Sequence, residues 1–291
     1  ESERSEAMVD VREAKLKKLC DQAWHEDGVK RVWLYKKAAG LGSAEAMRKL
    51  YEYYLRGAFT SLKKAYEWLY KAAKAGHPKS QFELYEAWQK GSRFAPKTRT
   101  EAISWCRKAA ENGYAKAMYE MSVLYAEGKM VNKDLAESFA WCKKAAEAEP
   151  DQYWASIASR YYHGEGTPAD LTKAYEWVKD RKVKSTLSWP GNLWDEIRKA
   201  YEGREKQQLT EQARTGDAAV QLAFAKKLLD KDEGVEARKW LEKAAKQGSG
   251  EAMLLLGDSI SQNPAWSRSA AMKKEAARWY EKAAQQGMSF T

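Results

Sequence analysis

The stretch WLYKAAKAGHP, residues 68–78, decides the fold because close copies of it recur along the chain. The copies read WCRKAAENGY at 105–114, WCKKAAEAEP at 141–150, WLEKAAKQGS at 240–249 and WYEKAAQQGM at 279–288, with a weaker LYKKAAGLG at 34–42. The leading positions 34, 68, 105, 141 and 177 lie 34 to 37 residues apart. A repeat of this length predicts a solenoid of stacked supersecondary units rather than one globular core.

Each copy of this phrase predicts a short amphipathic helix. In the copy at 68–78, Trp68, Leu69, Ala72 and Ala73 fall on one helical face, and the lysine before the alanine pair points outward. A glycine follows eight residues after the leading position in most copies, as at Gly76. Glycine is favoured just past the C-terminus of a helix, so the phrase is expected to end there.

A second helix is expected after each of these turns, because apolar residues recur there at a spacing of four. Four such sets end in glycine: Ala46, Leu50, Tyr54 and Gly57; Ser80, Leu84, Trp88 and Gly91; Ala117, Met121, Tyr125 and Gly128; Tyr153, Ile157, Tyr161 and Gly164. Each repeat is therefore predicted to be a helix–turn–helix pair. Neither helix could bury its apolar stripe alone, and stacking supplies the core.

The order A-x-x-x-L-x-x-x-Y-x-x-G, a short loop, then A-x-x-W-x-x-K-A-A-x-x-G resembles the SEL-one-like repeat (SLR), a relative of the tetratricopeptide repeat. Residues 161–177 match its loop closely, with Tyr161–Gly164, Glu165–Gly166, Asp170, Lys173–Ala174 and Trp177. The resemblance covers roughly residues 30–180 and 210–288. It implies an all-α, right-handed superhelical solenoid and a role as an adaptor or binding module, and it implies no particular ligand.

The pattern divides the chain into four parts. Residues 1–30 are expected to carry an N-terminal capping helix with Leu16, Cys20 and Trp24 on one face, and residues 31–180 form the main array. After Trp177 the phrase breaks down, so 181–206 is interpreted as an irregular connecting segment or an eroded repeat. In the eroded alternative QLTEQARTG at 208–216 is a degenerate phrase, and the kink lies at 188–191, SWPG. Residues 207–291 are predicted to be C-terminal repeats.

The first and last residues of the sequence lead to two expectations, one about the location of the protein and one about its last repeat. It begins with Glu1 rather than Met, which is interpreted as signal removal or trimming, so a periplasmic or exported location is favoured over a cytoplasmic one. It ends at Thr291 directly after a phrase, so a final helix is expected to be missing. No apolar stretch approaches the ~18–20 residues that a membrane-spanning helix needs.

No constellation of residues suggests chemistry. His25, His77 and His163 are scattered, and neither H-x-x-x-H nor C-x-x-C occurs, so no metal, cofactor or catalytic residue is predicted. Cys106 and Cys142 occupy the same repeat position on helices expected ~8–10 Å apart, too far for a disulfide. They are predicted to be small buried apolar residues.

The positive charge of the chain bears on its partner. The net charge is +10, and the segment 60–110 alone holds eleven basic and four acidic residues, a net +7. The aromatic residues are in core register and so are unavailable for stacking on bases. An acidic protein surface is therefore favoured over nucleic acid, with charge mainly steering association.

A partner is expected in the concave groove, which the first helix of each pair lines in tetratricopeptide-like stacks. Positions two before, two after, five after and six after the core residues Leu50, Leu84, Met121 and Ile157 should face it. The predicted partner-binding residues are Arg48, Glu52, Arg56, Phe82, Glu86, Lys90, Tyr119, Tyr162 and His163. For the aromatic residues among them, filling the spaces between neighbouring repeats is the alternative.

The leading functional hypothesis is a non-enzymatic, protein-binding solenoid. Bacterial members of the SLR family include envelope-associated binding proteins and immunity proteins, so one reading is inhibition of a secreted toxin such as a phospholipase. The alternative is a scaffold or adaptor of an envelope or signalling assembly.

Overall fold

A computed structural model describes residues 14–23, 28–56, 60–180, 191–262 and 269–288. Regular structure in these ranges is helical, without a strand. The chain divides into two compact units, Glu1–Arg198 and Lys199–Thr291.

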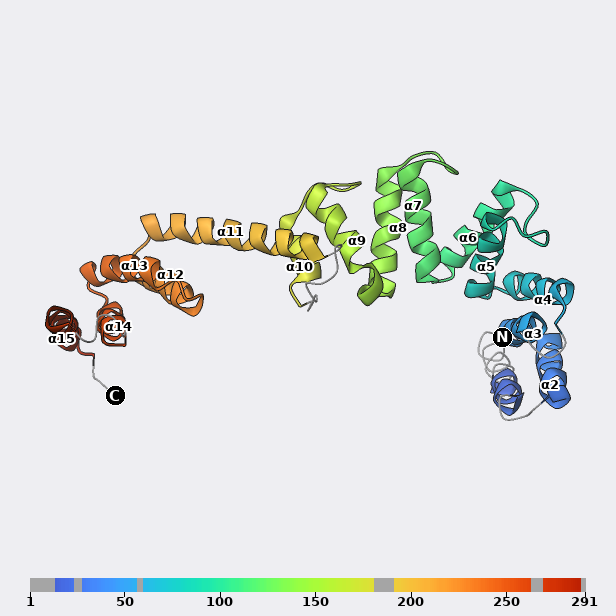
Figure 1. Ribbon diagram of the computed structural model, residues 1–291, viewed down its shortest axis with the longest axis horizontal. Coiled ribbons are helices and arrows are strands. Elements are labelled where there is room, and N and C mark those ends of the chain that lie inside the picture. Colours follow the sequence, from blue (N-terminus) through green and yellow to red (C-terminus); the bar gives the residue numbers. More distant parts are fainter. Residues whose placement is uncertain (1–13, 24–27, 57–59, 181–190, 263–268, 289–291) are drawn as a thin grey trace, which may run out of the picture. The chain divides into compact units, whose positions relative to one another are not determined.

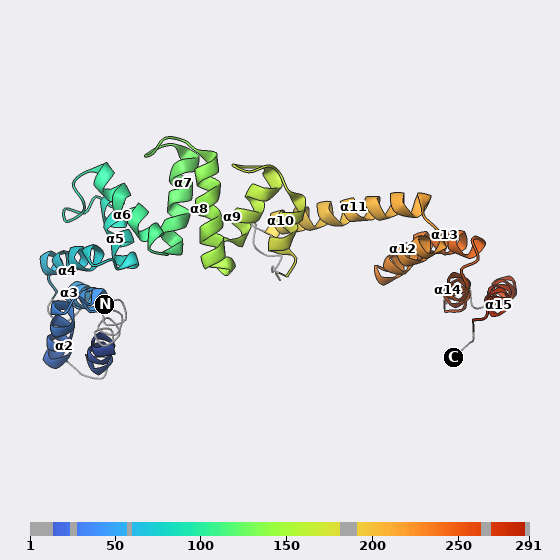
Figure 2. The same cartoon turned by 180° about the vertical axis from the view of Figure 1, so that it is seen from behind.

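Consecutive helices pack against each other from α2 to α10 in the first unit and from α12 to α15 in the second (Figures 1 and 2). In the first unit they are α2 (Gly28–Gly40), α3 (Ala44–Arg56), α4 (Leu62–Lys74), α5 (Pro78–Gln89), α6 (Arg99–Glu111), α7 (Ala115–Glu127), α8 (Leu135–Ala148), α9 (Pro150–His163) and α10 (Leu171–Val178). Then come α11 (Gly191–Thr215), which contains the boundary, and α12 (Ala218–Asp230), α13 (Gly234–Lys246), α14 (Gly250–Ser261) and α15 (Ala270–Gln285).

Each repeat is a helix pair, as the spacing predicted. We call the first members A helices (α3, α5, α7, α9, α12 and α14) and the second members B helices (α4, α6, α8, α10, α13 and α15). The A-helix core positions Leu50, Leu84, Met121 and Ile157 are fully buried. The recurring phrase lies on the B helices, and its alanine pair is buried in each copy from 68–78 to 141–150. The prediction of an all-α solenoid of stacked helix pairs is confirmed.

The lysine of the phrase lies over the leading tryptophan of the same helix. The Nζ–ring centroid distances are 4.2 Å for Lys71 and Trp68, 4.7 Å for Lys108 and Trp105, 4.3 Å for Lys144 and Trp141, 3.8 Å for Lys243 and Trp240, and 4.7 Å for Lys282 and Trp279. An ammonium over an indole face is attracted by the ring quadrupole. The lysine of the phrase therefore makes a local contact within its own helix.

Glycine ends most B helices because the chain reverses there in a left-handed conformation. Gly76 has φ +89°, and the next amide, His77 N, reaches Ala72 O at 3.0 Å, which is the Schellman arrangement. The copy at 141–150 lacks this glycine. There Glu149 has φ −133° and Pro150 starts α9 at once.

The sequence predicts a capping helix in residues 1–30 and, for residues 181–206, either an irregular connecting segment or an eroded repeat. Residues 14–23 are helical, with Leu19 and Ala23 buried against α2 and α3, whereas Trp24 lies outside the described residues. Residues 181–190, including the expected kink, also lie outside them. From Gly191 to 206 the chain is helical, so the irregular interpretation does not hold for those residues. The first turns of α11 belong to the core of the first unit, where Trp194 Nε1 donates to Val178 O at 2.7 Å.

The second half of α11 behaves as the degenerate phrase. Ala213, at the position of Ala73 in the clear copy, is fully buried, and its carbonyl accepts from Gln221 Nε2 at 3.0 Å. In the first unit Gln81 Nε2 donates to Ala73 O at the same distance. The same contact in both units supports the eroded-repeat interpretation of 208–216.

Candidate functional site

The predicted binding residues lie on four A helices of the first unit, α3, α5, α7 and α9, and side chains link these helices to one another. Arg48 on α3 contacts Glu83 on α5, and Tyr85 on α5 contacts Glu120 on α7. Arg160 on α9 donates from Nη2 to Ser122 Oγ on α7 at 2.9 Å. The A helices thus form one continuous face of the first unit. We call it the A-helix face.

Arg48 is buried in this face and does not project from it. Only 6% of the residue is exposed. Its Nη2 donates to Glu83 Oε1 at 2.8 Å and its Nε to Glu52 Oε1 at 3.1 Å. Burial opposes the charge of Arg48, but the hydrogen bonds to the two carboxylates outweigh it and raise the pKa of the guanidinium. The expectation that Arg48 faces a partner is wrong, because its position lies between consecutive A helices.

Phe82 needs the same correction. It is 3% exposed, and its ring lies 5.8 Å from that of Tyr85 and 5.4 Å from that of Tyr114. Lys116 Nζ lies 5.1 Å from the Phe82 ring centroid. For Phe82 the alternative stated at the sequence level holds: the aromatic ring fills the space between neighbouring repeats.

Tyr119 and Tyr162 are half-buried and present part of each ring to solvent. Tyr119 stacks on Tyr153 of the next A helix, with 4.9 Å between centroids and 25° between planes. Tyr162 packs edge-on against His163 of the last turn of α9 at 5.0 Å. A ring held by a neighbour loses little rotamer freedom on binding, so both tyrosines are suited to contact a partner.

The other predicted residues are exposed or half-exposed near the C-terminal ends of the A helices. Arg56, Lys90 and His163 are exposed, and Glu52 and Glu86 are half-buried. We call the accessible predicted residues the A-end surface: Glu52, Arg56, Glu86, Lys90, Tyr119, Tyr162 and His163. Of its two tyrosines, Tyr162 lies in the last turn of α9, whereas Tyr119 lies in the first half of α7. The structure thus keeps seven of the nine predicted residues accessible.

Sequence reasoning missed a hydrogen-bonded group beside this surface. Tyr85 Oη donates to Glu120 Oε1 at 2.6 Å, and Gln89 Nε2 donates to Tyr85 Oη at 2.8 Å and to Glu120 Oε1 at 3.1 Å. Burial and the neighbouring Glu120 carboxylate raise the pKa of Tyr85. The sequence signal that could have predicted this contact is the spacing of 35 residues between Tyr85 and Glu120, which is also the spacing between Arg48 and Glu83.

The charges of the A-helix face are largely paired. Lys116 Nζ lies 2.6 Å from Glu86 Oε1, and this hydrogen bond raises the pKa of Lys116. The basic residues of 60–110 lie mostly elsewhere, on α4, on α6 and in the loop between α5 and α6. Within the described part of the chain, ten of these eleven make no ion pair with an acidic side chain: Lys63, Lys64, Lys71, Lys74, Lys79, Arg93, Lys97, Arg99, Arg107 and Lys108. The unpaired positive charge of 60–110 therefore lies mainly on the B-helix side, and Lys79 on α5 is the exception.

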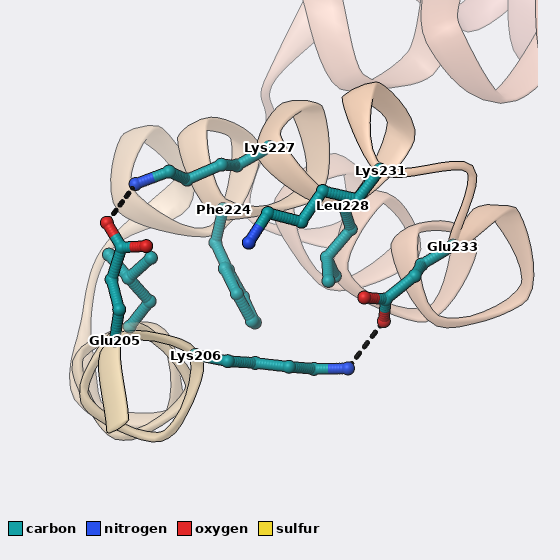
Figure 3. Close-up of a pocket in the computed structure, with 8 residues that line it drawn as sticks. Glu205, Lys206, Phe224, Lys227, Leu228, Lys231 and Glu233 are labelled. Atoms are coloured by element: carbon teal, nitrogen blue, oxygen red, sulfur yellow. Dashed lines mark hydrogen bonds and ion pairs between the residues drawn. The ribbon is translucent and has the colours of Figure 1, made fainter. Parts of the chain in front are cut away.

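The second unit has a small cavity between α11, α12 and α13, shown in Figure 3. Its volume of about 10 Å³ is room for roughly one water molecule. Ion pairs close its edges: Lys227 Nζ lies 2.7 Å from Glu205 Oε1, and Lys206 Nζ lies 2.5 Å from Glu233 Oε2. Phe224 points between them (Figure 3). These pairs join the helices, and the cavity is too small for a ligand.

The thiols of Cys106 and Cys142 are buried and free, as predicted, and burial raises the pKa of both. Across the described ranges, no cluster of three or more His, Cys, Asp or Glu side chains could hold a metal ion. Nor is any described helix long and apolar enough to cross a membrane.

Comparison with known proteins agrees with the repeat boundaries seen in the structure. The Sel1 repeat model matches residues 44–77, 87–114, 115–149, 152–179, 227–249 and 250–288. Its first match begins with α3 and ends just after α4, so one matched repeat is one A helix followed by one B helix. A search of curated proteins found no match.

Similar solved structures include a protein with an SLR fold and a Sel1 repeat protein. A protective antigen of uropathogenic Escherichia coli with an SLR fold is 26% identical (TM-score 0.49), over 88% of this chain and 56% of that one, so this chain spans a little over half its length. A Sel1 repeat protein from Oxalobacter formigenes is 25% identical (TM-score 0.44), over 88% and 93%. An immunity protein from Pseudomonas aeruginosa is 15% identical (TM-score 0.32), over 97% and 84%.

None of these likenesses assigns a ligand to this chain. The family itself follows from the repeat model, whose six matches cover more than half of the 291 residues. The chain belongs to the Sel1 repeat family.

Proposed function

We propose that this chain is a protein-binding repeat protein that holds a partner on the A-end surface. Sel1 repeats are typically protein-binding, and the chain carries six of them. The observation that supports this surface is the row of equivalent positions at the ends of α3, α5 and α9, where Arg56, Lys90 and His163 stay exposed. The buried neighbours of this row are locked in contacts between A helices, so the row stands on a fixed support.

Two half-buried tyrosines give this surface its expected binding energy. Aromatic side chains at the centre of an interface often contribute ~2 kcal/mol or more on truncation. Tyr119 and Tyr162 lie on α7 and α9, and each ring is packed on one side and open on the other. The paired charges around them make complementarity of shape and apolar contact more important here than net charge.

The test is capture of a partner from the source organism with the wild-type chain and a Tyr119→Ala/Tyr162→Ala variant. The matched control is Trp33→Ala, because Trp33 is 56% exposed on α2, outside this surface. A stoichiometric partner retained by Trp33→Ala and lost by the double variant is the expected result. A partner that survives the double variant would show that binding occurs elsewhere on the chain.

We further propose that binding inhibits the partner, as an immunity protein inhibits a secreted toxin enzyme such as a phospholipase. Family membership alone supports this finer step. The captured partner is assayed for hydrolytic activity before and after addition of an equimolar amount of this chain. Loss of activity on addition is expected, whereas full activity in the complex would identify a scaffold or adaptor instead.

A further inference from the structure

We propose that a groove between α6 and the loop joining α7 to α8 binds an acidic peptide segment of a partner protein. The groove, which we call the α6 groove, has a volume of about 400 Å³. It is lined by Arg99, Thr100, Ile103, Ser104, Arg107, Lys108, Glu111, Met130 and Val131. It lies on a B helix and is thus separate from the A-end surface, so the two proposals stand or fall independently.

The turn that borders the groove differs from the matching turn of the next repeat: it reads GKMVNKD at 128–134, where the next repeat has GEGTPAD at 164–170. In the next repeat Gly166, with φ +76°, brings its backbone against α8, where a Cβ on it would lie 1.9 Å from Leu135 O and 2.9 Å from Phe139 Cβ. The equivalent position 36 residues earlier is Met130. A Cβ is not compatible with the close approach that Gly166 makes, and Met130 lines the groove beside α6 instead.

The rim of the groove carries unbalanced positive charge. Arg99, Arg107 and Lys108 line it, and no described acidic side chain forms an ion pair with any of them. Arg107 Nη2 donates to the neutral Tyr125 Oη at 2.8 Å, which orients the guanidinium without cancelling its charge. Glu111 is the one carboxylate among the lining residues. Carboxylates are the natural partners of such a rim, since guanidinium groups bind them with two parallel hydrogen bonds.

The floor of the groove is aliphatic and favours a peptide over nucleic acid. Ile103, Met130 and Val131 are half-buried and offer apolar surface beside the cations. Single-stranded nucleic acids bind through aromatic rings that stack on bases, and no aromatic residue lines this groove. A segment with one apolar side chain flanked by Asp or Glu would fill the floor and neutralise the rim.

The experiment is a selection of random dodecapeptides displayed on phage against the full chain, followed by fluorescence anisotropy with the selected peptides. Enriched sequences are expected to place two or more acidic residues beside an aliphatic or aromatic one. Arg99→Glu/Lys108→Glu should weaken these peptides by about tenfold or more, and Met130→Glu should do so through the floor. The matched control, Lys63→Glu/Lys74→Glu, makes the same change in charge on α4 and should stay within about twofold of wild type.

Several outcomes would overturn the proposal. These are enriched peptides without acidic residues, peptides that bind equally to the groove variants, or an equal loss in the α4 control, which would indicate a general electrostatic field. A labelled oligothymidylate that binds more tightly than the peptides and is lost in the same variants would assign the groove to nucleic acid. Circular dichroism of each variant verifies that the helices remain folded.

Discussion

The close approach of Gly166 to α8 allows a sharp test of the packing that distinguishes two neighbouring repeats. Substitution of Gly166 by alanine adds one methyl group to a residue at φ +76°. That methyl carbon would lie 1.9 Å from the carbonyl oxygen of Leu135 and 2.6 Å from its carbonyl carbon. Backbone atoms cannot rotate away as a long side chain can, so the loop or α8 must move.

The expected cost has two parts. Alanine in the left-handed region costs about 1 kcal/mol relative to glycine. Forced overpacking adds roughly 1–3 kcal/mol, and the short distance to Leu135 places this site at the upper end. Gly166→Ala is therefore expected to cost about 3–4 kcal/mol. Gly76→Ala is the matched control, because Gly76 has φ +89° but no atom within 4 Å of an added Cβ, so it should cost about 1 kcal/mol.

Native-state hydrogen exchange is the suitable assay because stacked repeats open locally rather than as one unit. The free energy of opening is compared for amides of α8 and α10 in wild type and Gly166→Ala, and for amides of α4 and α5 in Gly76→Ala. The loss should be larger at α8 and α10 by about 2 kcal/mol or more. Equal losses in the two variants, within about 0.5 kcal/mol, would refute the packing argument.

Three further predictions concern buried and paired groups. Glu83→Gln leaves Arg48 buried with one carboxylate fewer and should lower the opening free energy of α3 and α5 by about 2–3 kcal/mol. Glu52→Gln should cost only ~0.5 kcal/mol because the Glu52 side chain is 42% exposed, and equal effects of the two variants in hydrogen exchange would contradict the assignment of Glu83 as the principal partner. Under native conditions a maleimide should modify Cys20 first and reach Cys106 and Cys142 only after urea unfolds the chain; prompt labelling of all three thiols would show that the core is open. A hydrogen bond with His77 lowers the pKa of Glu45 below 4.5, so the Glu45 carboxylate stabilises the fold above its unfolded-state pKa, and this stabilisation is lost as pH falls through its folded-state pKa. Thermal melts of Glu45→Gln at acid pH should lack this loss, and an acid profile equal to that of wild type would argue against the contact.

The helix pairs could be predicted from sequence because their signals are local. The phrase places tryptophan and two alanines on one face, and a glycine such as Gly76 ends the helix, so the period and the turn type follow from the letters. The eroded copy at 208–216 was harder to identify, because it keeps the alanine at 213 but has lost its tryptophan. The contact of Gln221 with that alanine shows its role, and a contact between helices has no local signature.

The candidate surface was only partly predictable. Position relative to the core placed Arg56, Lys90 and His163 correctly on the exposed ends of the A helices. The same rule wrongly predicted that Arg48 and Phe82 are exposed, whereas both are buried. The rule considers one helix at a time and does not take account of the next A helix beside it. Charge counted along the chain likewise gave +7 for 60–110 without showing that this charge lies mainly on the B-helix side.

The sequence by itself determined the repeat, the helix pair and the buried alanine and leucine positions, because hydrophobic periodicity and glycine turns act over a few residues. Tertiary structure decided which of the remaining side chains are exposed and which are buried in contacts between repeats. Arg48 is hydrogen-bonded to Glu83, 35 residues away, and Met130 lines the α6 groove at the position where the next repeat has Gly166. Both depend on the distance between neighbouring repeats, and that distance is set by packing across helices rather than along them.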